Sequence, residues 1–203
     1  MGVKRKIIFI LAAVAAAVGI FSAGVYAADE PLDHRIAEAN KVLNEMMVSP
    51  DQSIPEELLG KCKAIAIYPT MIKGGFVFGA RFGQGVVLKK GLDGQWGPPA
   101  FSTVVGGNWG LQIGIQATDL ILVVMNERGL NNLLRTKMTL GADASFAAGP
   151  IGRESQMATD ISLRTGILAY SRSRGLFAGA VFDGAVVTTD NYSNSKYYGK
   201  PVT

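Results

Sequence analysis

The chain has 203 residues, with 20 Lys and Arg against 16 Asp and Glu. Three of these basic residues, Lys4, Arg5 and Lys6, lie in an N-terminal segment that contains no acid, so the remaining chain carries 17 basic against 16 acidic residues. This near-neutral balance removes the main support for a nucleic-acid-binding domain, which would need a basic surface. The single cysteine, Cys62, excludes an intramolecular disulfide, and with one histidine, His34, in the predicted first helix the sequence shows no Cys/His metal motif and nothing that indicates a His-based catalytic triad.

Residues 1–27 have the pattern of a secretory signal peptide. A basic cluster precedes the apolar run 7–23, and Val25 and Ala27 are the small residues before a cleavage point after Ala27. An uncleaved anchor helix is the alternative, because the run is almost long enough to span a bilayer. We expect an exported, periplasmic protein that can lie against a membrane, with one domain over residues 28–203. Cys62 is far from the cleavage point, so we do not expect a lipoprotein.

The stretch "DHRIAEANKVLNEMM", residues 33–47, predicts an amphipathic helix. Its apolar face carries Ile36, Leu43, Met46 and Met47. Such a face either packs on the protein's own core or contacts a membrane. Its polar face mixes both charge signs, unlike a typical interfacial helix, which is rich in Lys and Arg.

The stretch "KGGFVFGARFGQGVVLKK", residues 73–90, alternates large and small residues with a period of two. This period predicts a strand, and the glycines within it do not fit a P-loop or a dinucleotide-binding turn, both of which open a helix. The run "DLILVVM", residues 119–125, predicts a strand buried on both faces. Asn126 can cap a short helix after it.

Further strands are expected within residues 137–149 and 161–171, followed by a hairpin that turns at Asp183-Gly184 and a C-terminal helix at 191–199. The predicted class is α+β: a β-rich, strongly twisted antiparallel sheet or barrel-like core with an N-terminal amphipathic helix and short helices. Export and alternation also permit a membrane-spanning barrel, but the run 119–125 and the helices argue against one.

The sequence does not indicate an active site. Its candidate acids, Asp119, Asp143, Asp160 and Asp183, are dispersed, and nothing pairs any two of them as acid and base. Asp143 lies alone among small residues, where we expect a structural hydrogen-bonding role rather than catalysis. We therefore predict a protein that is not an enzyme and needs no cofactor or metal.

Five stretches together resemble the SYLF lipid-binding domain family, which includes exported bacterial proteins and Ysc-type actin-binding regulators of fungi. They are "IPEELLGKCKAIAIYPTMIKGGFVFGARFGQGVVL", "WGPPAF", "GGNWGLQIG", "GADASFAAGPIGR" and "YSRSRGLFAGAVFDG". The resemblance implies a non-enzymatic domain that binds acidic phospholipids or phosphoinositide-like headgroups. We do not expect this exported chain to bind actin or nucleic acid, and its protein partner is unknown.

Seven basic residues are the predicted lipid contacts: Lys73, Arg81, Lys89, Lys90, Arg153, Arg172 and Arg174. Each cation near an anionic bilayer contributes about 1 kcal/mol, so three or four of them give only millimolar affinity. Useful binding would also need apolar surface, which the face of helix 33–47 or an exposed aromatic residue such as Trp96 could supply. The alternative function is a structural or stress-related periplasmic protein that binds a protein partner and has no lipid site.

Overall fold

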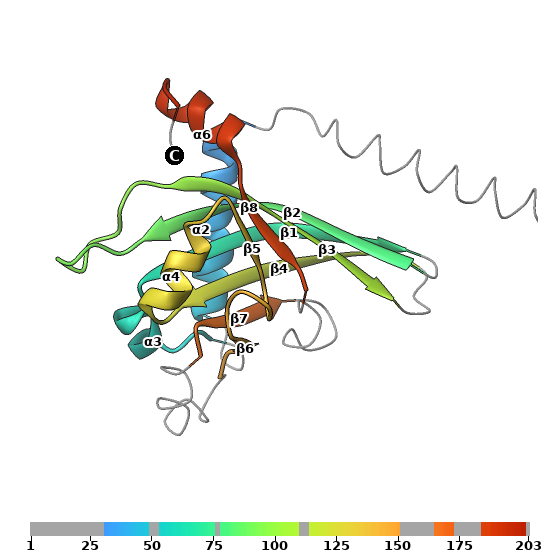
Figure 1. The fold of residues 1–203 in the computed structure, drawn as a ribbon, viewed down its shortest axis with the longest axis horizontal. Helices are drawn as coiled ribbons and strands as arrows, with labels where there is room; N and C mark the ends of the chain where they lie inside the picture. The colour runs from blue at the N-terminus through green and yellow to red at the C-terminus, as the bar shows by residue number, and fades with distance from the viewer. Residues whose placement is uncertain are drawn as a thin grey trace, which may run out of the picture. The chain divides into compact units, whose positions relative to one another are not determined.

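A computed structural model describes residues 31–48, 53–75, 78–109, 114–150, 165–172 and 184–201. Residues Leu32–Thr203 form one compact unit. Within the described part of this unit, eight strands form a single sheet in the order β5-β8-β3-β2-β1-β4-β7-β6 (Figure 1). The strands are β1 (Ala64–Gly75), β2 (Phe78–Lys89), β3 (Ala100–Trp109), β4 (Gly114–Val124), β5 (Lys137–Thr139), β6 (Phe146–Ala148), β7 (Ile167–Arg172) and β8 (Val186–Thr189).

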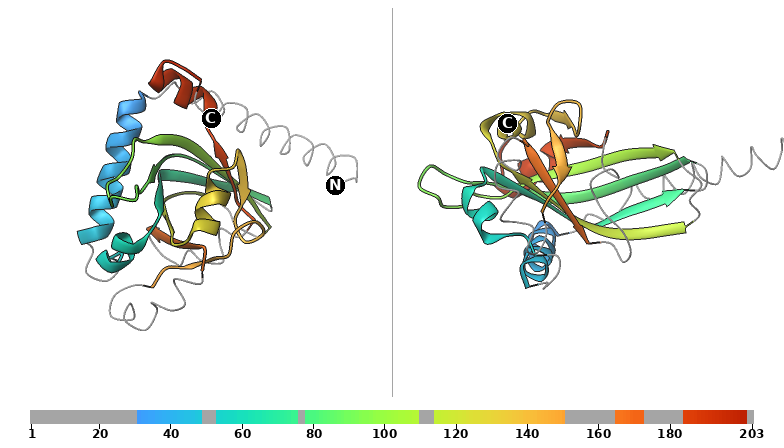
Figure 2. Two further views of the ribbon diagram at one scale, coloured as in Figure 1. Left: turned by 60° about the vertical axis from the view of Figure 1, so that its left-hand side comes forward. Right: turned by 90° about the horizontal axis from the view of Figure 1, so that it is seen from below.

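The four long strands β1 to β4 form the middle of the sheet, and all their pairings are antiparallel. The β6–β7 pair is parallel. The sheet is strongly curled, as Figure 2 shows. The predicted class, a β-rich α+β fold with a twisted sheet, is confirmed. β1 bends where its register shifts, at Thr70, whose φ is 49° and whose backbone N–H donates to the Asp119 carboxylate at 2.9 Å.

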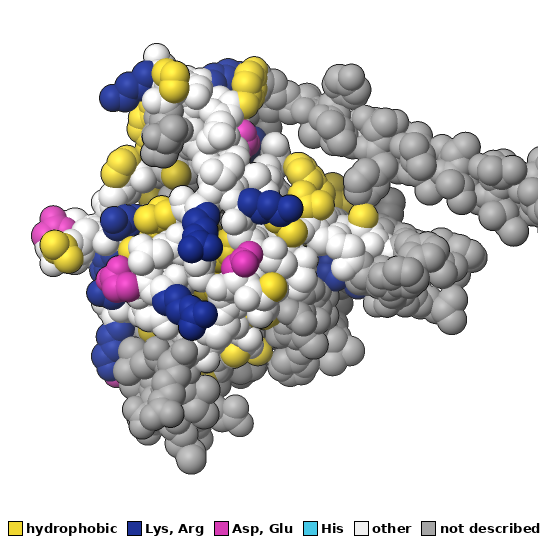
Figure 3. Space-filling view, in the orientation of Figure 1, with side chains coloured by type: hydrophobic (Ala, Val, Ile, Leu, Met, Phe, Trp, Pro, Cys, Tyr) yellow, Lys and Arg dark blue, Asp and Glu magenta, His cyan; other side chains and the backbone are white. Residues whose placement is uncertain are grey.

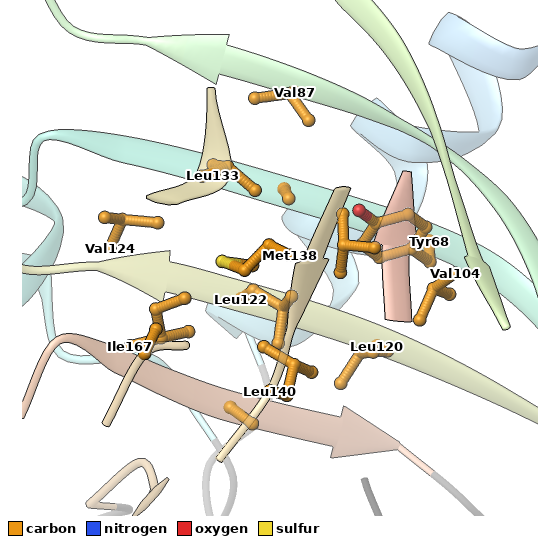
Figure 4. Close-up of a cluster of buried hydrophobic side chains, with 14 of the residues drawn as sticks. Tyr68, Val87, Val104, Leu120, Leu122, Val124, Leu133, Met138, Leu140 and Ile167 are labelled. Carbon is orange, nitrogen blue, oxygen red and sulfur yellow. The ribbon is translucent and has the colours of Figure 1, made fainter. Parts of the chain in front are cut away.

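Two apolar clusters cover opposite faces of the sheet, because successive strand side chains point to opposite sides. On one face, the helices α2 (Leu32–Val48) and α3 (Glu56–Lys61) pack over side chains such as Ile65, Ile67 and Val86. On the other face, α4 (Glu127–Leu133) and β5 pack over side chains such as Tyr68 and Leu122 (Figure 4).

The predicted helix 33–47 is confirmed as α2, and the predicted cap of α4 is also confirmed. The Asn126 side chain accepts a hydrogen bond from the Gly129 backbone N–H at 2.8 Å. The last helix, α6 (Asn191–Tyr198), begins after its cap Asp190 and follows β8. In the part of the chain that the structure describes, every helix is too short or too polar to cross a membrane.

Candidate functional site

The predicted basic residues do not form one patch among the described residues. Lys89 is exposed at the end of β2. The neighbouring Lys90 donates from Nζ to the carbonyl oxygens of Leu59 and Gly60, each at 2.9 Å, and lies 5.2 Å from the centre of the Trp96 ring. The Lys90 ammonium group therefore binds the last carbonyl oxygens of α3. This structural role occupies hydrogen-bond donors that would otherwise be available to a lipid headgroup.

Lys73 on β1 and Arg81 on β2 are register partners, whereas Lys89 lies at the other end of β2. Burial lowers the pKa of Lys73, and the nearby charge of Arg81 lowers it further. The Arg81 side chain is only 4 % exposed, and burial lowers its pKa too. Arg81 thus lies inside the sheet structure rather than on a surface that a bilayer could touch directly.

Arg172 is engaged in ion pairs. Its guanidinium bonds the Glu45 carboxylate of α2 and lies 3.1 Å from the Asp119 carboxylate of β4. The hydrogen bond that Arg172 donates to Glu45, together with both acidic charges, raises the pKa of Arg172 despite its partial burial. Arg172 therefore links α2 to the sheet.

Two further predicted lipid contacts, Arg153 and Arg174, lie outside the described residues.

The apolar face of α2 packs on the sheet. Met46 is buried in the core beneath the helix, and Ile36, Leu43 and Met47 pack against that core. Of the two uses that the sequence allowed for this face, the structure shows the internal one. The apolar surface needed for ligand binding must come from elsewhere.

An exposed apolar row supplies such a surface. It consists of Ala117, Ile72, Phe82 and Val105, one residue from each of four adjacent strands, which are direct register partners in that order. Ile72 is 54 % exposed, Phe82 is 39 % exposed and Val105 is 42 % exposed. Strand alternation places the row on the α2 face of the sheet, beyond the part that α2 covers at Ile67.

Neutral residues flank the apolar row on β2 and β3, whereas on β4 it is flanked by Asp119, whose carboxylate is paired with Arg172. Along the same face, the flanking positions are Ala80 and Gln84 on β2, and Thr103 and Gly107 on β3. An exposed apolar group that is flanked by neutral residues on two strands and by an already ion-paired carboxylate on a third marks a docking surface rather than an electrostatic headgroup site. The alternation that predicted the strand included Phe82, but it could not show which part of the face α2 leaves open.

Comparisons with known proteins identify the family. The family model Ysc84, described as "Las17-binding protein actin regulator", matches residues 105–203. Protein YSC84 of Saccharomyces cerevisiae is 34 % identical over 156 residues, which cover 75 % of this chain and 33 % of that protein. SH3 domain-containing YSC84-like protein 1 of Homo sapiens is 32 % identical over 167 residues, covering 79 % of this chain and 48 % of that protein. The chain belongs to the Ysc84 family. It spans about a third to a half of the length of these relatives.

Membership of the Ysc84 family agrees with the resemblance drawn from the sequence motifs, but it corrects one expectation about partners. We expected no actin binding. The matching model describes an actin regulator, and a further yeast relative, 33 % identical over 168 residues, is named LAS seventeen-binding protein 3. Protein and actin partners are therefore a property of the family. The family model is described as an actin regulator, one relative is named as a binding protein, and none of these names denotes an enzyme.

Proposed function

We propose that this chain is a non-enzymatic binding domain that docks a partner protein through the apolar row. The observation that carries this proposal is the exposure of Ile72, Phe82 and Val105 side by side across adjacent strands. Monomeric proteins leave single apolar side chains exposed without consequence, whereas a contiguous group of them marks an interaction site.

The energies fit the centre of a protein interface. Fully burying a large apolar side chain contributes about 1.5–3 kcal/mol, so three half-exposed side chains contribute roughly 3–4 kcal/mol when a partner covers them. Phe82 lies in the middle of the row, where interface hot spots concentrate. The names of the relatives make filamentous actin the first partner to test, because the matching family model describes an actin regulator.

The test is co-sedimentation of the protein with actin filaments. Phe82→Ser should reduce the bound fraction at least fivefold, because it removes the central anchor. Leu92→Ser is the matched control, since Leu92 is an exposed apolar residue in a turn outside the row. Thermal unfolding should show both variants folded. Equal filament binding by the protein and both variants would contradict docking through the row.

Binding of acidic phospholipids is a second candidate function. The observation that favours it is an apolar row that can insert between lipids, on a domain whose Lys89 ammonium group is exposed. About 3–4 kcal/mol from the row and about 1 kcal/mol from a cation would give binding of roughly 0.2 mM or weaker. Phosphatidylcholine and anionic vesicles, each at low and high salt, separate the candidates. Salt-sensitive pelleting with anionic vesicles, weakened by both Lys89→Glu and Phe82→Ser, would favour the lipid function.

Export through residues 1–27 is also proposed. Its support is the basic cluster, the apolar run and the small residues before Ala28. Intact-mass measurement of the protein recovered from the periplasm of an expressing bacterium should give a chain that starts at Ala28. A full-length chain that stays with the inner membrane would instead support a retained anchor.

A further inference from the structure

A polar cavity of about 580 Å³ that is widely open to solvent lies on the α4 side of the protein, across the sheet from the apolar row. Its lining residues are Arg128, Asn131, Asn132, Arg135, Ala142 and Asp143. Figure 3 shows Lys and Arg side chains gathered over α4 and β5 on this face, with an acidic side chain among them. The size lies within the range of small-molecule sites.

The two arginines of the cavity are not ion-paired with any residue that the structure describes. Arg128 lies in the first turn of α4 and Arg135 lies two residues beyond its end, and both line the cavity together with Asn131. Arg35 and Arg172, by contrast, are both paired with carboxylates. Arg128 and Arg135 therefore keep their hydrogen-bond donors available to a ligand.

Asp143, the acidic residue of the lining, is fixed in place by hydrogen bonds. One carboxylate oxygen of Asp143 accepts a hydrogen bond from the Thr139 backbone N–H at 2.6 Å. The backbone N–H of Asp143 donates to the Thr139 carbonyl at 2.9 Å, and the buried Asn132 side chain donates to the Asp143 carbonyl. The predicted structural role of Asp143 is thus confirmed. With two guanidinium groups and one carboxylate, the lining carries a net charge of +1.

The geometry points to a binding site for a phosphate monoester group in this cavity, held by Arg128 and Arg135. A guanidinium group presents a planar fork of donors that matches two oxygens of a phosphate, and a phosphate has enough oxygens to accept from two such forks. The Asn131 carboxamide adds neutral donors and an acceptor. Because the cavity is much larger than a phosphate ion, the remaining polar space suits a hydroxyl-bearing group attached to it.

This site is independent of the proposed function, because it lies on the opposite face of the sheet and uses different residues. The phosphate could belong to a soluble compound or to a lipid headgroup. Both share the same chemistry at the arginines, so the probes must differ only in what carries the phosphate: inorganic phosphate, glycerol 3-phosphate and vesicles that contain phosphatidic acid.

The experiment is an NMR titration of the protein at constant ionic strength, which follows the Nε–H signals of Arg128 and Arg135. Inorganic phosphate and glycerol 3-phosphate should shift both signals saturably, with tighter binding of glycerol 3-phosphate. Chloride at the same ionic strength should not shift them. Shifts that grow without saturation, or that chloride reproduces, would overturn the site.

The matched variants are Arg128→Gln/Arg135→Gln and Lys41→Gln/Lys200→Gln, which each remove two positive charges. Amide shifts of residues 127–143 report phosphate binding in the variants. The first pair should weaken phosphate binding at least tenfold, and the second should change it less than twofold. If the first pair also reduces pelleting with phosphatidic acid vesicles, the phosphate comes from a lipid; if it does not, the ligand is soluble. Equal weakening in both pairs would overturn the site, because only general charge would then matter.

Discussion

The guanidinium group of Arg35 lies 3.1 Å from the carboxylate of Asp190, and the two residues are 155 positions apart in the chain. Arg35 belongs to α2 and is only 5 % exposed, while Asp190 caps the first turn of α6. Asp190 also accepts hydrogen bonds from the backbone N–H and the hydroxyl group of Ser193, at 3.0 and 2.7 Å. The first and last helices of the described domain are thus joined by one buried ion pair.

Removing Arg35 should destabilise the domain strongly. Arg35→Met leaves the Asp190 carboxylate with no cationic partner in a largely buried place, which costs roughly 3–5 kcal/mol. Urea unfolding should show this loss. Lys41→Met on the same helix is the control, because Lys41 is exposed and its pairing with Glu38 is a surface one worth less than about 1 kcal/mol. A loss of similar size in both variants would contradict a special role for the buried pair.

The same ion pair predicts how stability depends on pH. Burial alone would raise the pKa of Asp190, but the hydrogen bonds from Ser193 and Arg35 outweigh it, so the pKa lies below its ordinary value of 3.8. A carboxylate with a depressed folded-state pKa stabilises the protein above its unfolded-state pKa, and this contribution disappears as the pH falls through the folded-state pKa. The difference in unfolding free energy between the protein and Asp190→Asn should be constant from pH 7 to 5. It should then shrink below about pH 4. A difference that stays the same down to pH 2 would contradict this assignment.

Tyr68 offers a test of the core on the α4 face. Its ring is fully buried, and its hydroxyl group shares a hydrogen bond of 2.9 Å with the buried Ser102 hydroxyl group. Tyr68→Phe leaves the Ser102 hydroxyl group without that partner and should lower the unfolding free energy by about 1–2 kcal/mol. Adding Ser102→Ala should recover part of this loss, because no buried polar group is then left unpaired. Tyr192→Phe, at an exposed position, should change little.

Sequence patterns could predict the elements but not which surfaces other elements cover. The period of residues 33–47 indicated α2, and alternation indicated β2, because both depend on local spacing. The exposure of Phe82 depends on how far α2 reaches across one face of the sheet, and the burial of Arg81 depends on what covers the other face. The local spacing of residues predicts neither of these. The cavity beside Arg128 was missed for a similar reason: it forms where the turn before Asp143 folds back against α4.

A glycine within β2 should tolerate no side chain. A Cβ atom on Gly85 would lie 2.3 Å from the Ile67 carbonyl oxygen and 2.4 Å from the Tyr68 ring, so Gly85→Ala must push the backbone of β1 or the ring aside. Overpacking of this kind costs about 1–3 kcal/mol. Gly60→Ala is the control, since nothing lies within 4 Å of its added Cβ in α3, and alanine should stabilise a helix there by up to about 1 kcal/mol. Thermal unfolding should therefore move in opposite directions for the two variants.

Cys62 should be unreactive as long as the protein is folded. The thiol is buried, its Sγ lies 3.2 Å from the Leu59 carbonyl oxygen, and burial raises its pKa to about 11 even though the charge of Lys90 opposes the rise. At pH 8 only about one such thiol in a thousand is ionised, and the thiolate is the form that reacts. Alkylation by iodoacetamide should be at least a hundredfold slower in native buffer than in urea. In Leu92→Cys, the new thiol in an exposed turn should react rapidly while Cys62 does not. Rapid labelling of Cys62 in the folded protein would show that the strand end near α3 opens to solvent.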